Sequence, residues 1–520
     1  MRSTWLASCL LPCLWVCLAH AQPDQPAVVA DAHAAELDAY IGKAMLDWNQ
    51  PGLSIAIVKD DRPVYVKGFG VRELGKPGRV DAHTRFGMMS TTKAMVALAV
   101  AMLVDEGKLA WDEPVQKVLP WFEMPDAAFS RKLTVRDTLR HNAGLGPDAD
   151  LLWLRGDLDS RQILERVREL TPAYVPYSGF SYANVMYQVA GELVAAASGI
   201  PWDRFVETRI MQPLGMNESS ATHAGMLAQH ADNVSVPYFE IDGKLRRVSD
   251  GSVDGVPAAG AAWSSASDMA RWLAFLLADG QVDGKRLVSE KNFRELFAPQ
   301  VLVPAEEFYP TAKLTHPHWT SYGLGWFQQD YRGHFVAMHT GSIDGRTSII
   351  GLMPEANLGV YVFGNADHVE LRHALLWKVM DLYTGAPERD WSTELLGLYG
   401  DLKAEGKKKK AERDAKRVTG TRPSHPLAAY AGTYSHPAFG DIEVTLEKRI
   451  LTLRVGPLPE NSGPLKHWHY DSFRWHPGDG RQGEPDAQFG QSSDGSIDSL
   501  LLGEGNPVRF DRKVLPKAAD

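Results

Sequence analysis

The sequence has little cysteine, no excess of basic residues and no long apolar segment outside its N-terminus. Only three cysteines occur among 520 residues, and all of them precede residue 18. The formal net charge is −9, whereas nucleic-acid binding favours a basic face. No segment beyond the N-terminus is long and apolar enough to cross a bilayer. The sequence therefore predicts no nucleic-acid partner and no stable membrane span.

Residues 1–21 are predicted to be an export signal. Arg2 supplies a positive start, Leu10–Leu18 is a short apolar run, and Ala19-His20-Ala21 fits the small-x-small cleavage rule. Cleavage near Ala21 would give a secreted or periplasmic protein, and an uncleaved membrane anchor is the alternative. The mature chain would contain no cysteine, which excludes disulfides, a thiol nucleophile and cysteine-based metal sites.

Changes of pattern along the chain predict three segments after the signal. Residues 27–388 carry strands at both ends with a mainly helical block between them, and residues 389–425 form a charged linker or helix. Residues 426–515 alternate apolar and polar positions between glycine-rich turns. We expect the first segment to be an α+β domain, with one antiparallel sheet built from both ends, flanking helices and a helical insert. The last segment is predicted to be a small β-barrel or sandwich.

A serine and a lysine stand three residues apart at the start of an apolar stretch. Ser90 and Lys93 open a helix predicted to end near Asp105, and its apolar positions lie all round, which is typical of a buried helix. Residues three apart share a helix face, so the amine can reach the hydroxyl. Burial lowers a lysine pKa, and a serine nucleophile needs such a proton acceptor. The alternative is a helix-capping serine followed by an ordinary surface lysine.

Two further short motifs carry polar groups that suit the same chemistry. Tyr182 and Asn184 follow a turn, and a tyrosine beside cations loses its proton more easily and can act as a general base. His339 and Gly341 end a predicted strand, where a glycine lets a substrate backbone lie along the strand edge. Taken singly, each motif has a structural alternative: a packed core tyrosine with a capping asparagine, and a strand entering a turn.

The three motifs occur in the order S-x-x-K, Y-x-N and H-x-G, and in this order they resemble one family. The resemblance is to the class C β-lactamases and to the related penicillin-binding esterases and D-peptidases. The segments that agree are 86–93, 133–145, 179–187, 260–268 and 339–345. It implies a β-lactamase/transpeptidase-like fold, followed over residues 426–515 by the small lipocalin-like barrel found in some of these hydrolases.

The resemblance also implies a role for each motif residue. Ser90 would be acylated while Lys93 and Tyr182 share the proton transfers. Asn184 would bind a substrate amide, and the backbone N–H groups of Ser90 and Ser342 would hold the oxyanion.

One position departs from the β-lactamase pattern. His339 and Gly341 of the third motif are both expected to bind substrate. His339 stands where β-lactamases usually carry a lysine, which is associated with the carboxylate of penicillins. Arg346 is a candidate to supply the missing positive charge, because it is near in sequence. The departure favours esters, or peptides with D-residues, over β-lactams as substrates.

The sequence thus predicts a secreted serine hydrolase of the esterase or D-peptidase type, acting on a small-molecule or peptide substrate without a cofactor. A class C-like β-lactamase, and a penicillin- or peptidoglycan-binding protein without turnover, remain alternatives. His316 with His318, and His467 with His469, lack acidic or cysteine companions at ligand spacing, so no metal site is predicted. The sequence leaves the oligomeric state open.

Overall fold

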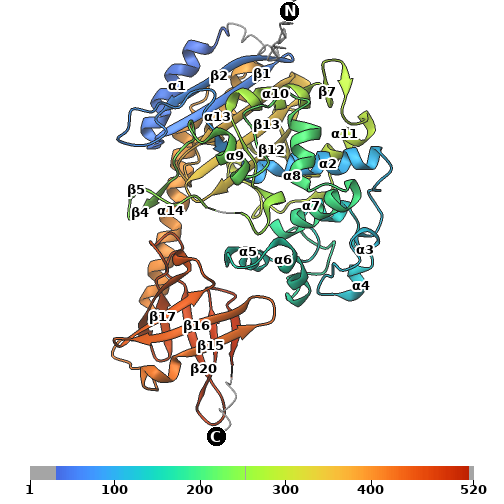
Figure 1. The fold of residues 1–520 in the computed structure, drawn as a ribbon. Coiled ribbons are helices and arrows are strands. Elements are labelled where there is room, and N and C mark those ends of the chain that lie inside the picture. Colours follow the sequence, from blue (N-terminus) through green and yellow to red (C-terminus); the bar gives the residue numbers. More distant parts are fainter. Residues whose placement is uncertain (1–30, 252, 514–520) are drawn as a thin grey trace, which may run out of the picture.

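The computed structural model describes residues 31–251 and 253–513. The predicted export signal lies outside the described residues. Figure 1 shows two folded parts: a larger α+β part, and a β-barrel joined to it by the long helix α14 (Trp391–Ala415).

The larger part is built on one antiparallel sheet of eight strands in the order β2-β1-β14-β13-β12-β11-β10-β9. The two ends of this part of the chain meet inside the sheet, because β1 pairs directly with β14. The sequence prediction of a sheet assembled from both ends is therefore confirmed. The bounds of its strands are β1 (Gly52–Lys59), β2 (Arg62–Gly70), β9 (Val301–Leu302), β10 (Thr320–Tyr322), β11 (Phe327–Tyr331), β12 (His334–Ile343), β13 (Arg346–Met353) and β14 (Leu358–Gly364).

Helices cover both faces of this sheet. Helix α10 contacts β1 and β14 from one side, and α13 contacts β13 and β14. The helical block packs around α2, whose residues from the lysine at 93 to the leucine at 103 are all buried. The helix bounds are α1 (Ala34–Asp47), α2 (Lys93–Asp105), α3 (Val115–Val118), α4 (Ala127–Ser130), α5 (Leu151–Leu154), α6 (Ser160–Arg166), α7 (Asn184–Ser198), α8 (Trp202–Val206), α9 (His223–His230), α10 (Ala266–Leu277), α11 (Glu290–Phe297), α12 (Ala312–Thr315) and α13 (Leu371–Thr384).

Three short strand pairs complete the larger part. Strand β3 (Phe86–Gly87) lies just before the S-x-x-K motif and pairs with β6 (Trp263–Ser264). The other two are hairpins, β4 (Tyr238–Ile241) with β5 (Lys244–Arg247), and β7 (Gln281–Val282) with β8 (Lys285–Arg286).

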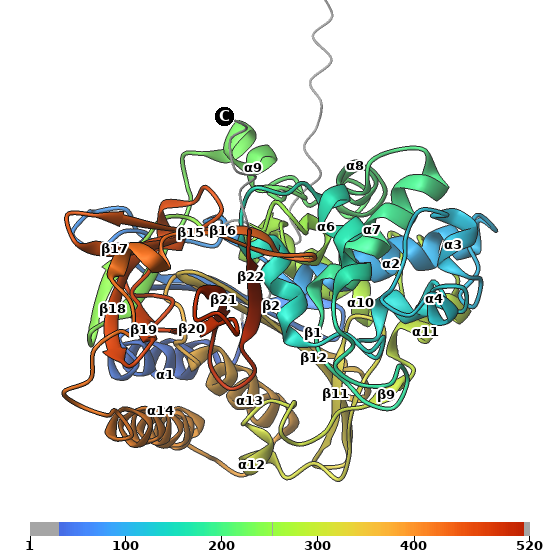
Figure 2. The ribbon, with the colours of Figure 1, turned by 90° about the horizontal axis from the view of Figure 1, so that it is seen from below.

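The C-terminal part is a closed eight-stranded barrel. Figure 2 shows it from below, with α14 seen nearly end-on outside it. Alternate residues of its strands are buried, as in β16 (Gly440–Glu447), because successive side chains of a strand point to opposite faces. The remaining barrel strands are β15 (Gly432–His436), β17 (Ile450–Val455), β18 (Ser462–His469), β19 (Ser472–Trp475), β20 (Asp486–Gln491), β21 (Ile497–Leu502) and β22 (Val508–Arg512).

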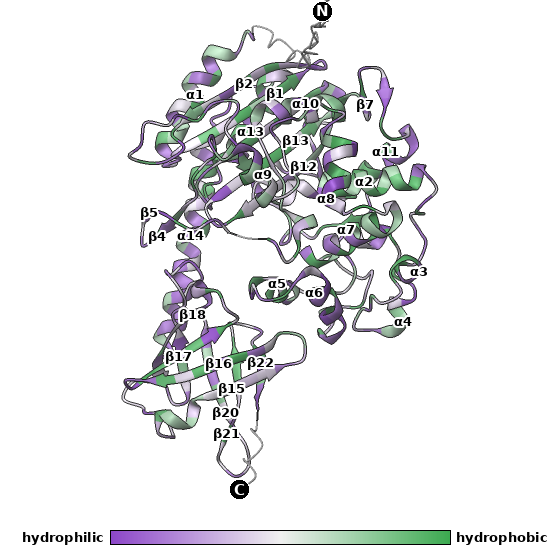
Figure 3. Cartoon of the chain, viewed as in Figure 1, coloured by the Kyte–Doolittle hydropathy of each residue, from purple (hydrophilic) through white to green (hydrophobic). Residues whose placement is uncertain are grey.

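Hydropathy separates the sheet from the connecting helix. Figure 3 shows apolar colours along the central strands and polar colours along the lower half of α14. The four lysines at 407–410 lie on this exposed half, and three of them pair with acidic side chains. Residues 391–415 of the segment expected to be a charged linker or helix are helical.

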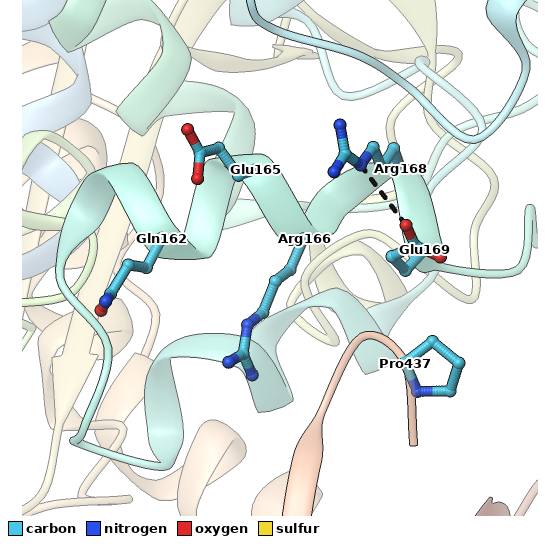
Figure 4. A pocket seen from close by; sticks show the side chains of 6 residues that line it. All are labelled: Gln162, Glu165, Arg166, Arg168, Glu169 and Pro437. Atoms are coloured by element: carbon cyan, nitrogen blue, oxygen red, sulfur yellow. Dashed lines mark hydrogen bonds and ion pairs between the residues drawn. The ribbon is translucent and has the colours of Figure 1, made fainter. Parts of the chain in front are cut away.

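The barrel also contacts the larger part directly. The Arg155 guanidinium donates to the carbonyl oxygens of Phe439 and Asp441 at 2.6 and 2.9 Å, and Arg481 pairs with Asp344 at 2.6 Å. An open groove of about 470 Å³ lies at this junction (Figure 4). It is lined by Gln162, Glu165, Arg166, Arg168 and Glu169 of the larger part and by Pro437 of the barrel.

Candidate active site

The candidate nucleophile sits on a sharp turn between a strand and a helix. Ser90 lies in a short 3₁₀ turn (Met89–Thr92) that leads straight into α2. The residue before it, Met89, has φ 52°, a left-handed backbone conformation that is rare for a residue with a side chain and costly for it. Such strain is often stored at functional sites. Ser90 is thereby held at the helix entrance, with its side chain partly exposed.

Lys93 faces the nucleophile from the first position of α2. Its Nζ lies 3.0 Å from Ser90 Oγ and donates to Asn184 Oδ1 at 2.8 Å and to the Ala259 carbonyl at 2.7 Å. The side chain is fully buried, and burial lowers its pKa to about 7, against the opposing charge of Asp150. The amine is therefore about half neutral at pH 7 and mostly neutral above it, and in the neutral form it can accept the Ser90 proton.

Asn184 connects the lysine to a buried carboxyl group. Its Oδ1 accepts from Lys93, and its Nδ2 donates to Asp150 Oδ2 at 2.9 Å. Asn184 is the first residue of α7, and the capping residue before it, Ala183, makes no side-chain cap. The structure thus rules out the alternative of a helix-capping asparagine. Both ends of the Asn184 amide are engaged inside the protein, so its contact with a substrate amide stays a prediction.

Tyr182 lies beside these groups, but its electrostatics differ from the expectation. We expected neighbouring cations to lower its pKa; instead burial raises it well above the ordinary value, and only the nearby Ser90 hydroxyl opposes the rise. The Lys93 ammonium position is 4.9 Å from its ring centroid, so the two groups are neighbours. Its phenol oxygen is buried and makes no well-formed hydrogen bond. Tyr182 is therefore a protonated phenol that can donate, rather than a ready-made base.

A buried histidine supports the tyrosine ring. The centroids of the His141 and Tyr182 rings are 4.2 Å apart. His141 Nδ1 accepts from the Ala183 N–H at 3.1 Å, and burial lowers the His141 pKa well below its ordinary value. The imidazole is thus neutral, with its proton on Nε2. It contributes to the shape of the site without adding charge.

The H-x-G motif lies on β12, next to the nucleophile. His339 is buried; its Nδ1 contacts the Thr340 carbonyl oxygen at 2.7 Å and its Nε2 contacts the Tyr322 hydroxyl at 3.1 Å. Burial lowers its pKa to about 3, so the ring is neutral and does not replace the positive charge of a lysine. Ser342, further along the strand, is exposed.

Gly341 is needed for packing against the nucleophile turn. A Cβ at this position would lie 2.4 Å from the Met88 carbonyl oxygen and 2.7 Å from Met89 Cβ. The glycine therefore lets β12 lie directly on the backbone that presents Ser90. We expected this glycine to make room for a substrate backbone. In the structure it makes room for the Met88–Met89 backbone of the protein itself.

An arginine from α13 holds the same stretch of β12. Arg372 donates to the Gly341 carbonyl oxygen at 2.5 Å and to Ser342 Oγ at 2.8 Å. Glu370 binds the guanidinium through both oxygens, at 2.9 and 3.1 Å. This arginine lowers the pKa of the Glu370 carboxyl well below its ordinary value. The pair fixes the strand that carries the proposed oxyanion residue.

Arg346 is engaged away from the motif residues. Its Nε donates to Ser235 Oγ at 3.1 Å, its Nη1 pairs with Asp250, and its guanidinium lies 4.6 Å from the Trp263 ring centroid. Only 2% of its surface is exposed. Its positive charge is paired with Asp250, an exposed carboxylate, and its part in substrate binding stays a prediction.

The structure therefore places Ser90, Lys93, Tyr182 and Asn184 together, with the H-x-G strand alongside. The residues missed by the sequence reasoning are Asp150, His141, Tyr309 and Arg372. His141 belongs to the H-N-A-G-L segment, which signalled a landmark without a role. The other three sit in loops or at a helix start without a spacing rule to reveal them.

Among the described residues no group of three or more histidine, cysteine or acidic side chains could hold a metal ion.

A serine, a neutral amine and a phenol meeting beside an open strand edge define a serine acyl-transfer enzyme. A family model described as Beta-lactamase matches residues 37–384. The chain belongs to the Beta-lactamase family, and it is a serine hydrolase of that family. A second model, described as a domain of unknown function (DUF3471), matches residues 416–513. None of the helices in the described residues has the length and apolarity to cross a bilayer.

Curated relatives and solved structures agree with this assignment. The chain is 29% identical over 444 residues to "Unguisins hydrolase ungD'" of Aspergillus campestris, covering 78% of this chain and 77% of the relative. It is 23% identical to "Protein flp" of Staphylococcus aureus, covering 64% and 62%.

Among solved structures, the octameric penicillin-binding protein homologue from Pyrococcus abyssi aligns with a TM-score of 0.60 at 23% identity, covering 92% of this chain and 99% of that one. A D-amino acid amidase from Ochrobactrum anthropi aligns at 0.52 and 23%, covering 64% and 91%. At these identities the structures show a shared fold, and the predicted β-lactamase/transpeptidase-like fold is confirmed.

Proposed function

We propose that this protein hydrolyses ester or amide bonds through an acyl-enzyme on Ser90, with an esterase or D-peptidase type of specificity. The observation that carries the proposal is the 3.0 Å contact between Ser90 Oγ and the amine of Lys93, a fully buried lysine whose pKa is lowered to about 7. Relatives named a hydrolase and a D-amino acid amidase support the reaction class.

In the proposed reaction Lys93 takes the Ser90 proton as the serine oxygen bonds to the substrate carbonyl carbon. The negative carbonyl oxygen is held by the backbone N–H groups of Ser90 and Ser342. The bond to the alcohol or amine then breaks. The leaving group takes a proton from the Tyr182 hydroxyl. Lys93 then gives Tyr182 the proton that it received from Ser90. Water then attacks the Ser90 ester and gives a proton to Lys93. The bond between the acyl carbon and Ser90 Oγ breaks, Lys93 returns the proton to Oγ, and the acid is released.

The first experiment is labelling with a fluorophosphonate probe, followed by turnover of a p-nitrophenyl ester and a D-amino-acid amide. We expect stoichiometric labelling at Ser90 and its loss in Ser90→Ala. The matched control is Ser493→Ala, an exposed barrel serine, which should label normally. Absence of labelling in the folded wild type would contradict the proposal.

Two alternatives give different results in the same assay. A penicillin- or peptidoglycan-binding protein without turnover would show a stoichiometric burst of product and then stop. A class C-like β-lactamase would hydrolyse nitrocefin much faster than any ester or amide. We expect slow nitrocefin hydrolysis, because His339 is neutral where β-lactamases use a cation.

The location of the protein is part of the proposal. We infer that the enzyme is secreted or periplasmic after cleavage near Ala21, on the strength of the N-terminal pattern alone. Mass spectrometry of the mature N-terminus from an exporting host tests this. An intact Met1 on the purified protein would contradict it.

A further inference from the structure

Strand β12 has an open edge beside the nucleophile. It pairs with β11 only as far as Met338, while its pairing with β13 continues to Ile343. The N–H of Thr340 points out of this open edge, because it donates to a side chain there instead of to β13. Backbone groups of a strand alternate in direction, so the N–H of Ser342 lies on the same edge.

A tyrosine occupies the Thr340 end of this edge. The Thr340 N–H and Thr340 Oγ1 converge on the Tyr309 hydroxyl oxygen, at 3.0 and 3.2 Å. Two donors that converge on one oxygen form a point suited to a carboxylate or carbonyl oxygen of a ligand. Here the protein's own phenol fills that point. The ring of Tyr309 is held against Phe327 and His373, with centroid distances of 4.8 and 5.3 Å.

The acceptor group of Thr340 is engaged as well. Its carbonyl oxygen contacts His339 Nδ1 at 2.7 Å, and Tyr322 contacts the other nitrogen of that ring. Thr340 therefore offers a substrate neither its N–H, its hydroxyl nor its carbonyl. On this edge the open backbone lies further on, at the exposed Ser342.

The position of Tyr182 indicates which end of the substrate faces Thr340. The Tyr182 ring lies 6.1 Å from His339 and 6.3 Å from Phe327, centroid to centroid. Since Tyr182 is the group that protonates the leaving atom in the proposed reaction, the leaving group departs on this side. The Thr340 end of the edge is then the leaving-group end.

The charges around this end do not favour an anion. His339 is neutral, because burial lowers its pKa to about 3. Arg372 acts electrostatically on Tyr309, but Glu370 binds its guanidinium through two oxygens. A leaving group that carries a carboxylate would therefore lose its hydration here, and neither His339 nor Arg372 would offer it an uncompensated positive charge.

We propose that Tyr309 is a specificity-determining residue that closes the leaving-group end to carboxylates. The enzyme then acts on esters and amides whose leaving group is uncharged, such as an alcohol, ammonia or an amine without a carboxyl group. This inference rests on the proposed function and narrows its substrate class. Two kinds of compound are then expected to be poor substrates. They are peptides whose leaving amino acid carries the free C-terminal carboxylate, and β-lactams with their ring carboxylate.

The test uses two esters that differ only in that charge: 4-acetoxybenzoate and its methyl ester. The variants are Tyr309→Ala, which removes the ring and frees Thr340, and Tyr309→Phe, which frees the donors alone. Tyr470→Phe, an exposed barrel tyrosine, is the matched control. Each kcat/KM is divided by the rate with hydroxide, which corrects for intrinsic reactivity.

We expect the wild type and Tyr470→Phe to favour the methyl ester by about 100-fold, as buried polar groups discriminate strongly. Tyr309→Ala should reduce this preference by about tenfold or more through faster hydrolysis of the charged ester, and Tyr309→Phe should reduce it less. A wild type indifferent to the charge, or an unchanged preference in an active Tyr309→Ala, would overturn the inference alone. Absence of Ser90 labelling and of both ester activities would overturn the proposed function and this inference with it.

Discussion

The two parts of the molecule each bury a cation, and they treat it in opposite ways. In the barrel, Arg474 is 3% exposed and pairs with Asp414 of α14 at 2.9 Å and with Asp486 of β20 at 2.6 Å. In the larger part, Lys93 is fully buried among a hydroxyl, an amide and a carbonyl oxygen.

The difference lies in the kind of cation and in its partners, and not in the depth of burial, because a buried lysine can lose its proton and an arginine does not. Two carboxylates supply opposite charge to the arginine, and the resulting ion pairs tie α14 to the barrel wall. The hydrogen-bond partners of Lys93 are neutral, so burial lowers the pKa of its amine to about 7. The charge of Asp150 opposes this lowering only in part. A buried charge with its counter-ions stabilises structure, whereas a buried amine without them becomes a proton acceptor.

Lys93→Met breaks the chemical half of this comparison most strongly. We expect kcat/KM for esters and amides to fall by about 1000-fold or more, because the nucleophile loses its proton acceptor. The thermal unfolding midpoint should not fall, because methionine fills the same space without a group to desolvate. Steady-state kinetics and calorimetry on the same sample check both. A large loss of stability with retained activity would reverse the assigned role.

Tyr182→Phe sharpens the assignment of the phenol as a proton donor. We expect a loss of about 10- to 100-fold for an amide, whose nitrogen must be protonated to leave. The loss should be smaller for a p-nitrophenyl ester, whose phenolate leaves without a proton. The ratio of the two losses is the measurement. Equal losses for both substrates would indicate that Tyr182 does not act on the leaving group.

Arg474→Met tests the structural half of the comparison. We expect the free energy of unfolding to fall by about 1–3 kcal/mol, since Asp414 and Asp486 lose a buried partner while staying partly exposed to water. Activity per folded molecule should be retained. The matched control is Arg454→Met, a half-exposed arginine of the same barrel paired with Glu443, which should change stability little. Chemical denaturation curves of the two variants decide between them.

Much of this arrangement could be predicted from the sequence where a local pattern carries it. The all-round apolar pattern that begins at Ser90 identified a buried helix near the observed bounds of α2. The three motifs placed Ser90, Lys93 and Tyr182 in one site. The short strands β9 and β10 were missed, because two or three residues are too few to show a period.

The electrostatics could not be predicted in the same way. The Tyr182 pKa depends on how deeply three distant segments bury the phenol, and the sequence indicated only neighbouring cations. Tyr309 reaches Thr340 from 31 residues away without a motif, so its place at the strand edge is a product of tertiary packing. The neutral state of His339 likewise follows from burial that no spacing reveals.

The central claim is that Lys93 loses its proton near neutral pH, which gives an uncharged amine beside Ser90. Its direct test is an NMR titration of protein labelled with ¹³C at lysine Cε, with the Lys93→Met spectrum identifying the resonance. The account predicts one lysine that titrates with a midpoint near 7 and is absent from the variant. A Lys93 resonance that stays protonated up to about pH 10, as an exposed lysine does, would contradict it.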